Sequence, residues 1–536
     1  MKMSILISTV AFSMVFAAAG KVKQEQLSIS VDGDNIINTL PDNFFGHNYW
    51  MWCPTWGNSI AGTESVVADL NPAMLRLGGI SVDVDYPDKV SEDVLADFYN
   101  YCQEVGAEPL LQLQLANSTS TEDRVNKALG MVSCFKTLGE FTYVSIGNEP
   151  DLYPDNLATN PDYGVEYLSS YTLDDYCTDF NAVASRLKEE YPDLKIVGLE
   201  LSHKYSEWIP DFMSRCREYV DAVSLHYYPN SADQCKYRNV HNDISSMQNF
   251  YTNARSYIDQ NAGGKEIPLI IGETNISWDG DPEHSTYDAS PGTFNAGLWF
   301  ADFVGISSAQ EMLLSIMPWS IREGWTLGFL DGSQKPRPVY YMYQLFSTYS
   351  KKHMIHNESV NSYVRSYGYK DDENNVSLFA INWDTVSSYT ADFTFTNILS
   401  GSSFSYTIPP HSISCLVFSD NNADNPRIIK YTKDMEGEPP TSIRNIFPGT
   451  AVQSDKMLTA SFNRKRNLLT ISTSRSYDNV TAEMVNISGR LIHAVDVGTI
   501  THGRSSFSIS GKNSALGIYV IRLLSDKKVI FTGKVQ

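Results

Sequence analysis

The sequence contains the apolar run Tyr143-Val144-Ser145-Ile146-Gly147-Asn148-Glu149-Pro150, which ends in an amide, a carboxylic acid and a proline. The run is short and rich in β-branched and aromatic residues, which favours a buried strand over a helix segment. Pro150 lacks the N–H group that the next ladder position needs, so strand pairing should stop there. A Glu149 at the carboxyl end of a buried parallel strand would lie where α/β barrels place their active sites. Taken by itself, Glu149 could equally well cap the following helix.

A second apolar strand that ends in a glutamate is predicted at Pro268-Leu269-Ile270-Ile271-Gly272-Glu273-Thr274-Asn275. The two strands together supply a pair of carboxyl groups. Hydrolysis of a glycosidic bond uses one carboxylic acid to protonate the leaving oxygen and a second carboxylate to attack or stabilise the oxocarbenium-like centre. Glu149 and Glu273 can fill these two roles.

From Gly147 to Tyr153 the sequence reads Gly-Asn-Glu-Pro-Asp-Leu-Tyr. Together with the second glutamate, this motif resembles the clan A retaining glycoside hydrolases, and most of all the heparanase and β-glucuronidase family. In that clan, Asn-Glu-Pro after the fourth barrel strand carries the acid/base, and a glutamate after the seventh strand carries the nucleophile. The resemblance therefore implies that Glu149 is the acid/base and Glu273 the nucleophile. Xylosidase-like and endoglucanase-like families of the same clan remain close competitors.

Apolar strands alternate with amphipathic helical stretches over residues 41–350, which predicts a parallel α/β sheet. The predicted strand cores are Phe44 to Tyr49, Met74 to Leu77, Leu110 to Leu115, Tyr143 to Gly147, Ile196 to Leu199, Ala222 to Leu225, Leu269 to Gly272 and Leu314 to Pro318. The clearest helices are Glu92 to Val105, Glu122 to Phe135, Leu173 to Tyr191, Asp243 to Asn261 and Asn295 to Ala309. Eight strand–helix units predict a (β/α)8 TIM barrel. On this count Glu149 follows strand four and Glu273 follows strand seven, independently of the resemblance.

Short alternating strands replace this pattern over residues 351–419 and predict a small β-sandwich domain. A hairpin around Asp32-Gly33-Asp34 is predicted within residues 20–40, and heparanase-type relatives recruit such N-terminal strands into their sandwich. Residues 420–449 are polar, contain Pro426, Pro439, Pro440 and Pro448, and show no periodicity. We therefore expect a linker there.

Residues 450–536 are predicted to form a separate all-β module. Its layout, with Leu516-Gly517-Ile518-Tyr519-Val520 before a terminal Lys534-Val535, resembles the C-terminal sorting domain of the bacterial type IX secretion system. The resemblance implies that secretion machinery is a partner of this module. The ending departs slightly from the usual pattern, so an accessory immunoglobulin-like or carbohydrate-binding module remains an alternative.

The N-terminus predicts export of the chain. Lys2 precedes the apolar run from Ile5 to Phe16, and Ala17-Ala18-Ala19 follows. This is the pattern of a secretory signal peptide, here residues 1–19, and the run is too short for a stable membrane anchor. We therefore expect a secreted or surface-attached protein.

The charge balance and the cysteines exclude several other functions. The chain has 41 Lys and Arg against 62 Asp and Glu, and its net charge of -21 repels phosphate backbones, so no nucleic acid partner is expected. The seven cysteines are widely spaced and form no Cys-x-x-Cys or Cys/His cluster. They indicate neither a zinc site nor a disulfide framework, and we expect mostly buried free thiols and no cofactor.

Four residues at neighbouring strand ends are candidates to support the pair. Arg76 is a charge inside an apolar strand, which is costly unless a carboxylate pairs with it. In the clan, an arginine at this strand bonds the nucleophile and keeps it ionised. Asn148 can bond the sugar 2-hydroxyl, a contact that strengthens in the transition state. Related enzymes keep a His or Tyr near the nucleophile after strand six, which points to His226 and Tyr228, although a core His is more often merely satisfied.

Aromatic and cationic residues near the strand ends are weaker candidates. Trp319 could form a platform under a bound sugar, and Trp50, Trp52 and Trp56 crowd the region after strand one, although aromatic clusters usually belong to a core. Heparanase-like enzymes need cations to bind a uronic carboxylate. The candidates for that role are Lys204, Arg322, Lys335 and Arg337.

Three function classes are compatible with a barrel of this kind, and the residues distinguish them. A secreted retaining glycoside hydrolase that acts on β-linked oligo- or polysaccharides requires both glutamates, and both are present. A non-catalytic carbohydrate-binding or adhesion protein on the same scaffold would be favoured by loss of either one. A metal-dependent barrel hydrolase would need a His-x-His strand or clustered Asp/His ligands, and the ten histidines supply neither, so no metal is expected. The oligomeric state, the sugar and the linkage stay open.

Overall fold

The computed structural model describes most of the chain up to residue 444 and seven further strands beyond it. The described ranges before that point are 24–50, 60–323, 325–359, 361–419, 421–424 and 426–444. The predicted signal peptide, Trp52, Trp56 and Cys53 lie outside the described residues.

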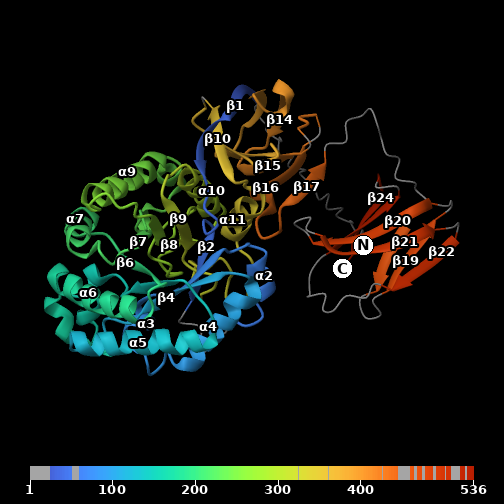
Figure 1. Ribbon diagram of the computed structural model, residues 1–536. Coiled ribbons are helices and arrows are strands. Elements are labelled where there is room, and N and C mark those ends of the chain that lie inside the picture. Colours follow the sequence, from blue (N-terminus) through green and yellow to red (C-terminus); the bar gives the residue numbers. More distant parts are fainter. Residues whose placement is uncertain are drawn as a thin grey trace, which may run out of the picture.

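Eight parallel strands form the centre of the larger body, each beside the next in chain order (Figure 1). They are β2 (Gly46–Trp50), β3 (Met74–Gly78), β4 (Glu108–Leu113), β5 (Tyr143–Ile146), β6 (Lys195–Leu201), β7 (Ala222–Tyr227), β8 (Leu269–Thr274) and β9 (Leu313–Pro318). A parallel bridge from Phe45 to Ile316 brings the last strand back to the first. The predicted TIM barrel is confirmed, and each predicted strand core overlaps an observed strand.

Helices surround this sheet, as Figure 1 shows. They are α2 (Glu64–Ala68), α3 (Ile80–Asp85), α4 (Glu92–Val105), α5 (Thr121–Leu138), α6 (Leu173–Glu190), α7 (Tyr205–Cys216), α8 (Tyr237–Val240), α9 (Ile244–Asn261), α10 (Phe294–Ser308) and α11 (Pro338–Tyr349). Helix α6 begins with a capping box between Thr172 and Asp175, which satisfies two of its first N–H groups. The five predicted helices are observed within a few residues of their expected bounds.

A second sheet of nine strands covers one side of the barrel. It consists of β1 (Gln24–Thr39), β10 (His353–Ser359), β11 (Val364–Lys370), β12 (Val376–Asn382), β13 (Ser388–Thr396), β14 (Ser403–Ile408), β15 (Ser412–Phe418), β16 (Arg427–Thr432) and β17 (Thr441–Arg444). Strands from both parts of the sheet share a core, in which the rings of Phe395 and Phe404 lie 5.2 and 5.7 Å from that of Phe418. The sheet therefore folds over itself in the manner of a sandwich.

Helix α10 lies between the barrel and the nine-stranded sheet. Every one of its residues is buried, because the barrel covers one side of the helix and the nine-stranded sheet covers the other. Its Asp302 accepts hydrogen bonds from Tyr367 Oη (2.9 Å) and Trp383 Nε1 (2.8 Å), and it pairs with Arg365. A buried carboxylate is thus fully engaged by the sheet.

The predicted N-terminal hairpin is wrong. Residues 24–39 form the single strand β1, which pairs in parallel with β13 and antiparallel with β10. The expected turn at Asp32-Gly33-Asp34 is a bulge, where the register with β10 shifts between Asp32 and Ile36. A Cβ at Gly33 would lie 2.5 Å from Ile398, so a glycine is needed there to let the bulge pack.

The predicted linker at 420–449 is also corrected. Strands β16 and β17 lie in this range and extend the nine-stranded sheet. The ring of Tyr431 lies 5.2 Å from that of Phe294 on α10, and the Phe294 N–H donates to Glu436 Oε1 (3.1 Å). The polar, proline-containing composition hid two short strands whose apolar residues, such as Ile428 and Ile429, are buried.

Seven strands follow in the C-terminal region, which Figure 1 draws beside the nine-stranded sheet. They are β18 (Thr459–Asn463), β19 (Leu468–Thr473), β20 (Tyr477–Asn486), β21 (Leu491–Ile500), β22 (Gly503–Ser508), β23 (Tyr519–Ser525) and β24 (Lys528–Val535). They form a three-stranded and a four-stranded sheet. The predicted all-β character is confirmed, and the sorting role stays a prediction.

Two further observations concern membranes and thiols. Within the described residues, none of the helices combines the length and the apolar character that crossing a bilayer requires. The six described cysteines are free and mostly buried, as expected.

Two truncations test the corrected boundary. A chain ending at Asp420 loses β16 and β17 and exposes the surface that Ile428, Ile429 and Tyr431 cover. At about 1.5–3 kcal/mol for each buried side chain, we expect the free energy of unfolding to fall by roughly 5 kcal/mol. A chain ending at Arg444 keeps both strands and should retain the full-length melting temperature of the barrel. Calorimetry of the two truncated proteins checks this, and equal melting temperatures would show that β16 and β17 are dispensable.

Candidate active site

A pocket of about 570 Å³ opens at the carboxyl ends of the barrel strands. Asn148 and Glu149 follow β5, Glu273 is the penultimate residue of β8, and Trp319 follows β9. The other lining residues are Gly79, Ile80, Leu152, Asn156, Ser202, His203, Tyr228, Trp278, Glu323, Trp325 and Leu327. The structure therefore brings the two predicted glutamates into one cavity, at the end of the barrel where such folds carry their sites.

Glu149 adopts a left-handed backbone conformation with φ of 49°, which is uncommon for a residue with a side chain. Two contacts hold it there. Its N–H donates to the Glu200 carbonyl (2.9 Å), and the preceding N–H, of Asn148, donates to the buried Asp83 carboxylate (2.8 Å). Asp83 also accepts from the Tyr153 hydroxyl (2.6 Å), and burial raises the pKa of Asp83 to about 6. Such fixed, sparsely populated conformations cluster at functional sites.

Arg76 lies beneath the pocket with no exposed surface. Its guanidinium makes five hydrogen bonds to five side chains, at 2.8 to 3.1 Å. The acceptors are Asn48, Gln112, Asn148, Glu200 and Glu273. A Cβ at Gly78 would lie 2.4 Å from the Arg76 Cζ, so this glycine leaves room for the guanidinium. The expected pairing of Arg76 with Glu273 is present, at 2.8 Å.

Glu200 is the third carboxylate of this cluster and is fully buried, and it is not among the residues predicted from the sequence. It accepts from Arg76 Nε (3.1 Å), Ser224 Oγ (2.6 Å) and His226 Nε2 (3.0 Å). Burial alone would raise the pKa of Glu200, but Arg76 and His226 outweigh it and hold the pKa at about 2. A bulge between Leu199 and Leu201 turns Glu200 into the barrel. An acid inside the apolar run from Ile196 to Leu201 is the signal that could have revealed it.

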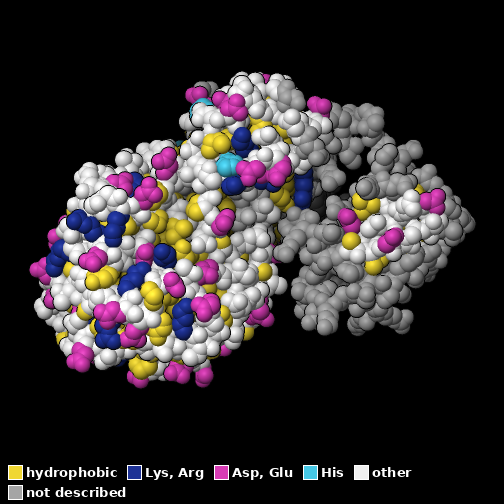
Figure 2. Space-filling view, viewed as in Figure 1, with side chains coloured by type: hydrophobic (Ala, Val, Ile, Leu, Met, Phe, Trp, Pro, Cys, Tyr) yellow, Lys and Arg dark blue, Asp and Glu magenta, His cyan; other side chains and the backbone are white. Residues whose placement is uncertain are grey.

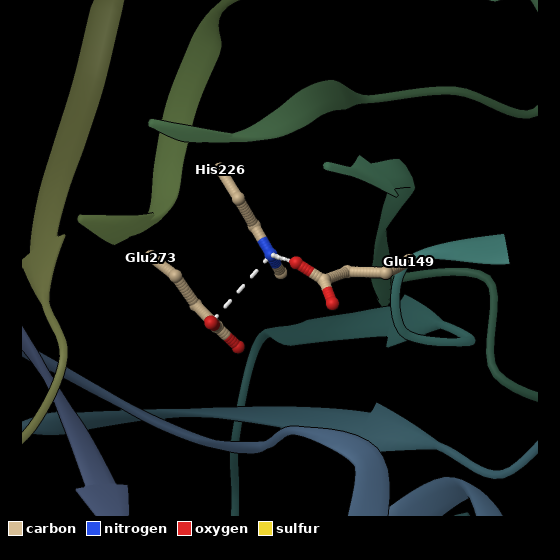
Figure 3. A group of neighbouring side chains, drawn as sticks. All are labelled: Glu149, His226 and Glu273. Atoms are coloured by element: carbon tan, nitrogen blue, oxygen red, sulfur yellow. Dashed lines mark hydrogen bonds and ion pairs between the residues drawn. The ribbon is translucent and has the colours of Figure 1, made fainter. Parts of the chain in front are cut away.

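His226 lies between the carboxylates and is fully buried. Its Nδ1 is 2.8 Å from Glu149 Oε1 and 3.6 Å from Glu273 Oε2 (Figure 3). Its Nε2 lies 3.0 Å from Glu200 Oε2. Burial lowers its pKa, but Glu273, Glu149 and Glu200 together raise it to about 10. His226 is therefore a cation at neutral pH, with an N–H on each nitrogen. The predicted supporting role is consistent with this contact.

Glu273 accepts from Arg76 Nη1 and from the Tyr228 hydroxyl, both at 2.8 Å. Burial raises its pKa, His226 and Arg76 lower it, and Glu149 raises it again, with a net shift upward. The expectation that Arg76 keeps this carboxylate ionised therefore holds in part only. Arg76 shares its charge among several acceptors, so it cannot fully offset the desolvation of Glu273.

Glu149 and Glu273 point toward the same space, with the His226 ring beside them (Figure 3). One oxygen of each carboxylate and the imidazole Nδ1 lie within 4.8 Å of one another. Three such atoms have the spacing of metal ligands. A metal would have to displace the proton on Nδ1, however, and the surrounding carboxylates hold that proton firmly. The arrangement therefore suits proton transfer and nucleophilic attack.

Aromatic side chains form the walls of the pocket. Trp319 lines it as predicted, and a Cβ at Gly79 would lie 2.8 Å from the Trp319 ring. Trp278 and Trp325 also line it and are 62% and 49% exposed, which is unusual for indoles. Neither is among the residues predicted from the sequence. Trp50 ends β2, and its side chain is not described.

The four predicted cations do not line the pocket among the residues described there. Lys204 Nζ donates to the Asp151 carbonyl (3.1 Å), and Arg322 Nη2 donates to the Gly332 carbonyl (2.7 Å). Arg337 donates to the carbonyls of Gly328 and Trp325 at 2.8 and 2.9 Å, and Lys335 Nζ lies beside Gly437. The four cationic side chains predicted to bind a uronic carboxylate thus lie outside the described lining of the pocket.

The Glu200→Gln substitution tests the importance of the third carboxylate. It leaves Arg76 and His226 one negative charge short in a buried site, which typically costs about 3–5 kcal/mol of unfolding free energy. We expect that loss together with at least a tenfold fall in activity, measured by denaturant titration and steady-state kinetics. Glu207→Gln, at an exposed acid of α7, is the matched control. If the two variants behave alike, Glu200 does not organise the site.

Comparison with known proteins adds the fold family. No protein-family model matches the sequence, and no curated protein matches it either. Among solved structures, CelM2, a bifunctional glucanase-xylanase from a metagenome library, is 14% identical with a TM-score of 0.57, over 74% of this chain and 99% of that one. An α-L-arabinofuranosidase from Thermotoga maritima is 13% identical (TM-score 0.56; 78% and 95%). A family 44 xyloglucanase from Paenibacillus polymyxa is 12% identical (0.53; 72% and 98%). The chain thus shares the fold of these glycoside hydrolases.

Proposed function

We propose that the protein is a retaining glycoside hydrolase that cleaves β-glycosidic bonds of oligo- or polysaccharides by double displacement. Glu149 acts as the acid and then the base, and Glu273 acts as the nucleophile. The observation that carries this proposal is the distance between the two carboxylates, one oxygen of each lying within 4.8 Å of the other. Retaining enzymes hold these groups about 5–5.5 Å apart, whereas inverting enzymes need about 6.5–9.5 Å to admit a water molecule.

The charges around the pair supply the proton that the reaction needs. Three carboxylates, Glu149, Glu200 and Glu273, face two cations, Arg76 and His226. One further proton neutralises the cluster. Carried by Glu149, it is the proton that the leaving oxygen receives while Glu273 attacks the anomeric carbon. In the second step Glu149 takes a proton from water, and the water displaces Glu273.

Asn148 is oriented for substrate by the same network. Its Oδ1 accepts from Arg76 Nη2 (2.8 Å), so the amide presents its NH2 group as a donor. Asn148 lines the pocket directly before Glu149. This orientation supports the assignment of Asn148 as the donor to the sugar 2-hydroxyl, next to the bond that breaks.

The sequence supports two further parts of the proposal, the export of the protein and its family within the clan. The signal peptide pattern and the C-terminal module favour export through secretion machinery to the cell surface or the medium. The Gly-Asn-Glu-Pro-Asp-Leu-Tyr wording favours the heparanase and β-glucuronidase family within the clan. A non-catalytic carbohydrate-binding protein is the alternative, and the complete network around Glu149 and Glu273 argues against it, since binding alone requires no such pair.

The raised pKa of Glu273 predicts the acid limb of the pH profile. Glu273 attacks only as a carboxylate, so activity should fall as the pH drops through its raised pKa, and the midpoint of kcat/KM should lie above 4.5. Tyr228 lowers this pKa through its hydrogen bond, so Tyr228→Phe should move the midpoint further up. Initial rates from pH 3 to 8 measure both values. A midpoint below 4.5, or a downward shift in the variant, would contradict the assignment.

Azide rescue of two variants separates the roles of the glutamates. In Glu149→Ala, no carboxylate remains to deprotonate water, so azide can attack the covalent intermediate and give a glycosyl azide with the anomeric configuration of the substrate. Activated aryl glycosides should still react, because they leave with little protonation. In Glu273→Ala the nucleophile is missing, and azide must attack directly and invert the configuration. Proton NMR of the products distinguishes the two.

The wild-type enzyme is the control in the same NMR experiment. Its first-formed sugar should keep the configuration of the substrate. If the two variants give the opposite pattern of azides, the roles of Glu149 and Glu273 are exchanged. If the wild-type product is inverted, the double-displacement mechanism is wrong.

A further inference from the structure

The charged side chains that line the pocket are acidic. Glu149, Glu273 and Glu323 face the cavity, and in the described part of its lining there is neither a Lys nor an Arg. His203 is the lining residue with an imidazole side chain, and its Nδ1 lies 3.4 Å from the Asp151 carboxylate. This nitrogen therefore faces Asp151.

The nearby arginines and lysines are committed elsewhere. Arg76 is buried beneath the pocket, where its N–H groups donate to Glu273 and to four other side chains. Arg337 lies behind the wall, bonded to two carbonyls, and Lys204 is turned toward Asp151 and Asp155. A carboxylate on a bound sugar would lie near Glu323 and would find neither a Lys nor an Arg among the described lining residues to pair with, which costs binding free energy.

Glu323 is the acid that the proposed chemistry does not use. It follows β9 and is 5% exposed, and its Oε1 accepts from the Leu327 N–H at 3.2 Å. Burial raises its pKa to about 7, against the effects of the Leu327 N–H, the Trp319 side chain and Arg337. A Cβ at Gly280 would lie 3.3 Å from Glu323 Oε1 and 2.5 Å from Leu327, so a glycine keeps this wall compact. The carboxyl group is therefore held in one place beside Trp319.

A fixed carboxyl group beside an indole matches the two faces of a neutral sugar. The ring hydrogens of the sugar can pack on Trp319, while hydroxyl groups at its edge donate to an acid. A carboxylate has two oxygens with about four lone-pair sites, so Glu323 can keep its bond to Leu327 and still accept from sugar hydroxyls. A hydrogen bond to a charged group is among the strongest available in such a site.

We infer that the sugar cleaved in this pocket is uncharged, and that Glu323 is a specificity residue that accepts hydrogen bonds from its hydroxyl groups and repels uronic acids. This inference rests on the proposed glycosidase function and names its substrate class. It departs from the uronic acid substrates implied by the heparanase resemblance.

A paired substrate panel tests the charge of the sugar. Each pair differs by a hydroxymethyl group against a carboxylate, as in nitrophenyl β-glucoside and nitrophenyl β-glucuronide, and neutral and uronic polysaccharides are assayed beside them. At pH 8, above the pKa of about 7 at Glu323, we expect kcat/KM or polysaccharide turnover to favour the neutral member at least tenfold. Equal or preferred hydrolysis of the uronic member overturns the inference and leaves the proposed function standing. Hydrolysis of no glycoside of either kind overturns the proposed function, and this inference with it.

The Glu323→Gln variant tests the residue. Its amide oxygen can still accept from the Leu327 N–H, so this segment of the pocket lining should keep its structure. A melting curve of the variant checks this. Loss of the charge should lower kcat/KM for the neutral substrate by roughly tenfold, the value of one hydrogen bond to a charged group, and should reduce the neutral-to-uronic ratio by at least as much. That ratio does not depend on how much of the protein is folded. Glu207→Gln is the control and should leave the ratio unchanged. An unchanged ratio in Glu323→Gln overturns the assigned role.

Discussion

The buried charge of Arg76 is the constraint on which the barrel end depends. A guanidinium with no access to water must have an acceptor for each N–H. This one takes its acceptors from β2, β4, β6 and β8 and from Asn148, in the segment that follows β5. The five side chains are thereby fixed relative to one another. The proposed catalysis by two carboxylates would need such fixed positions, because a misplacement of about 1 Å can cost two orders of magnitude in rate.

The same network ties the chemistry to stability. Glu200, His226 and Arg76 are fully buried, and the carboxylate of Glu200 pairs with both Arg76 and His226. Removing one of them leaves an uncompensated charge in a dry environment, so a change made to alter activity also changes the folding free energy. Glu273, the proposed nucleophile, is neutralised less completely than Glu200. Its pKa is raised, because burial and the neighbouring Glu149 together outweigh the attraction of the two cations.

Much of this arrangement could be predicted from the sequence, because alternating apolar strands and amphipathic helices have distinct periodicities. The barrel strands and the positions of Glu149 and Glu273 followed from such patterns. Glu200 did not, because a bulge decides which way its side chain points, and bulges have no sequence period. Strands β16 and β17 were missed for another reason. Both strands are short, β16 pairs with β15 and β17 forms the edge of the sheet beside β16, and a polar composition conceals them.

Strand β1 has a consequence for how the chain can fold. It is the first described element, yet it lies in the middle of its sheet, between β10 and β13, and pairs with residues as distant as Thr396. On the ribosome, this strand must wait until about four hundred residues have been made before its neighbours exist. The barrel can form in the meantime, but α10 stays uncovered on one side until the sheet closes over it. Assembly of the barrel and its covering sheet is thus completed only when β1 pairs with β13. Such a non-local step makes folding slow.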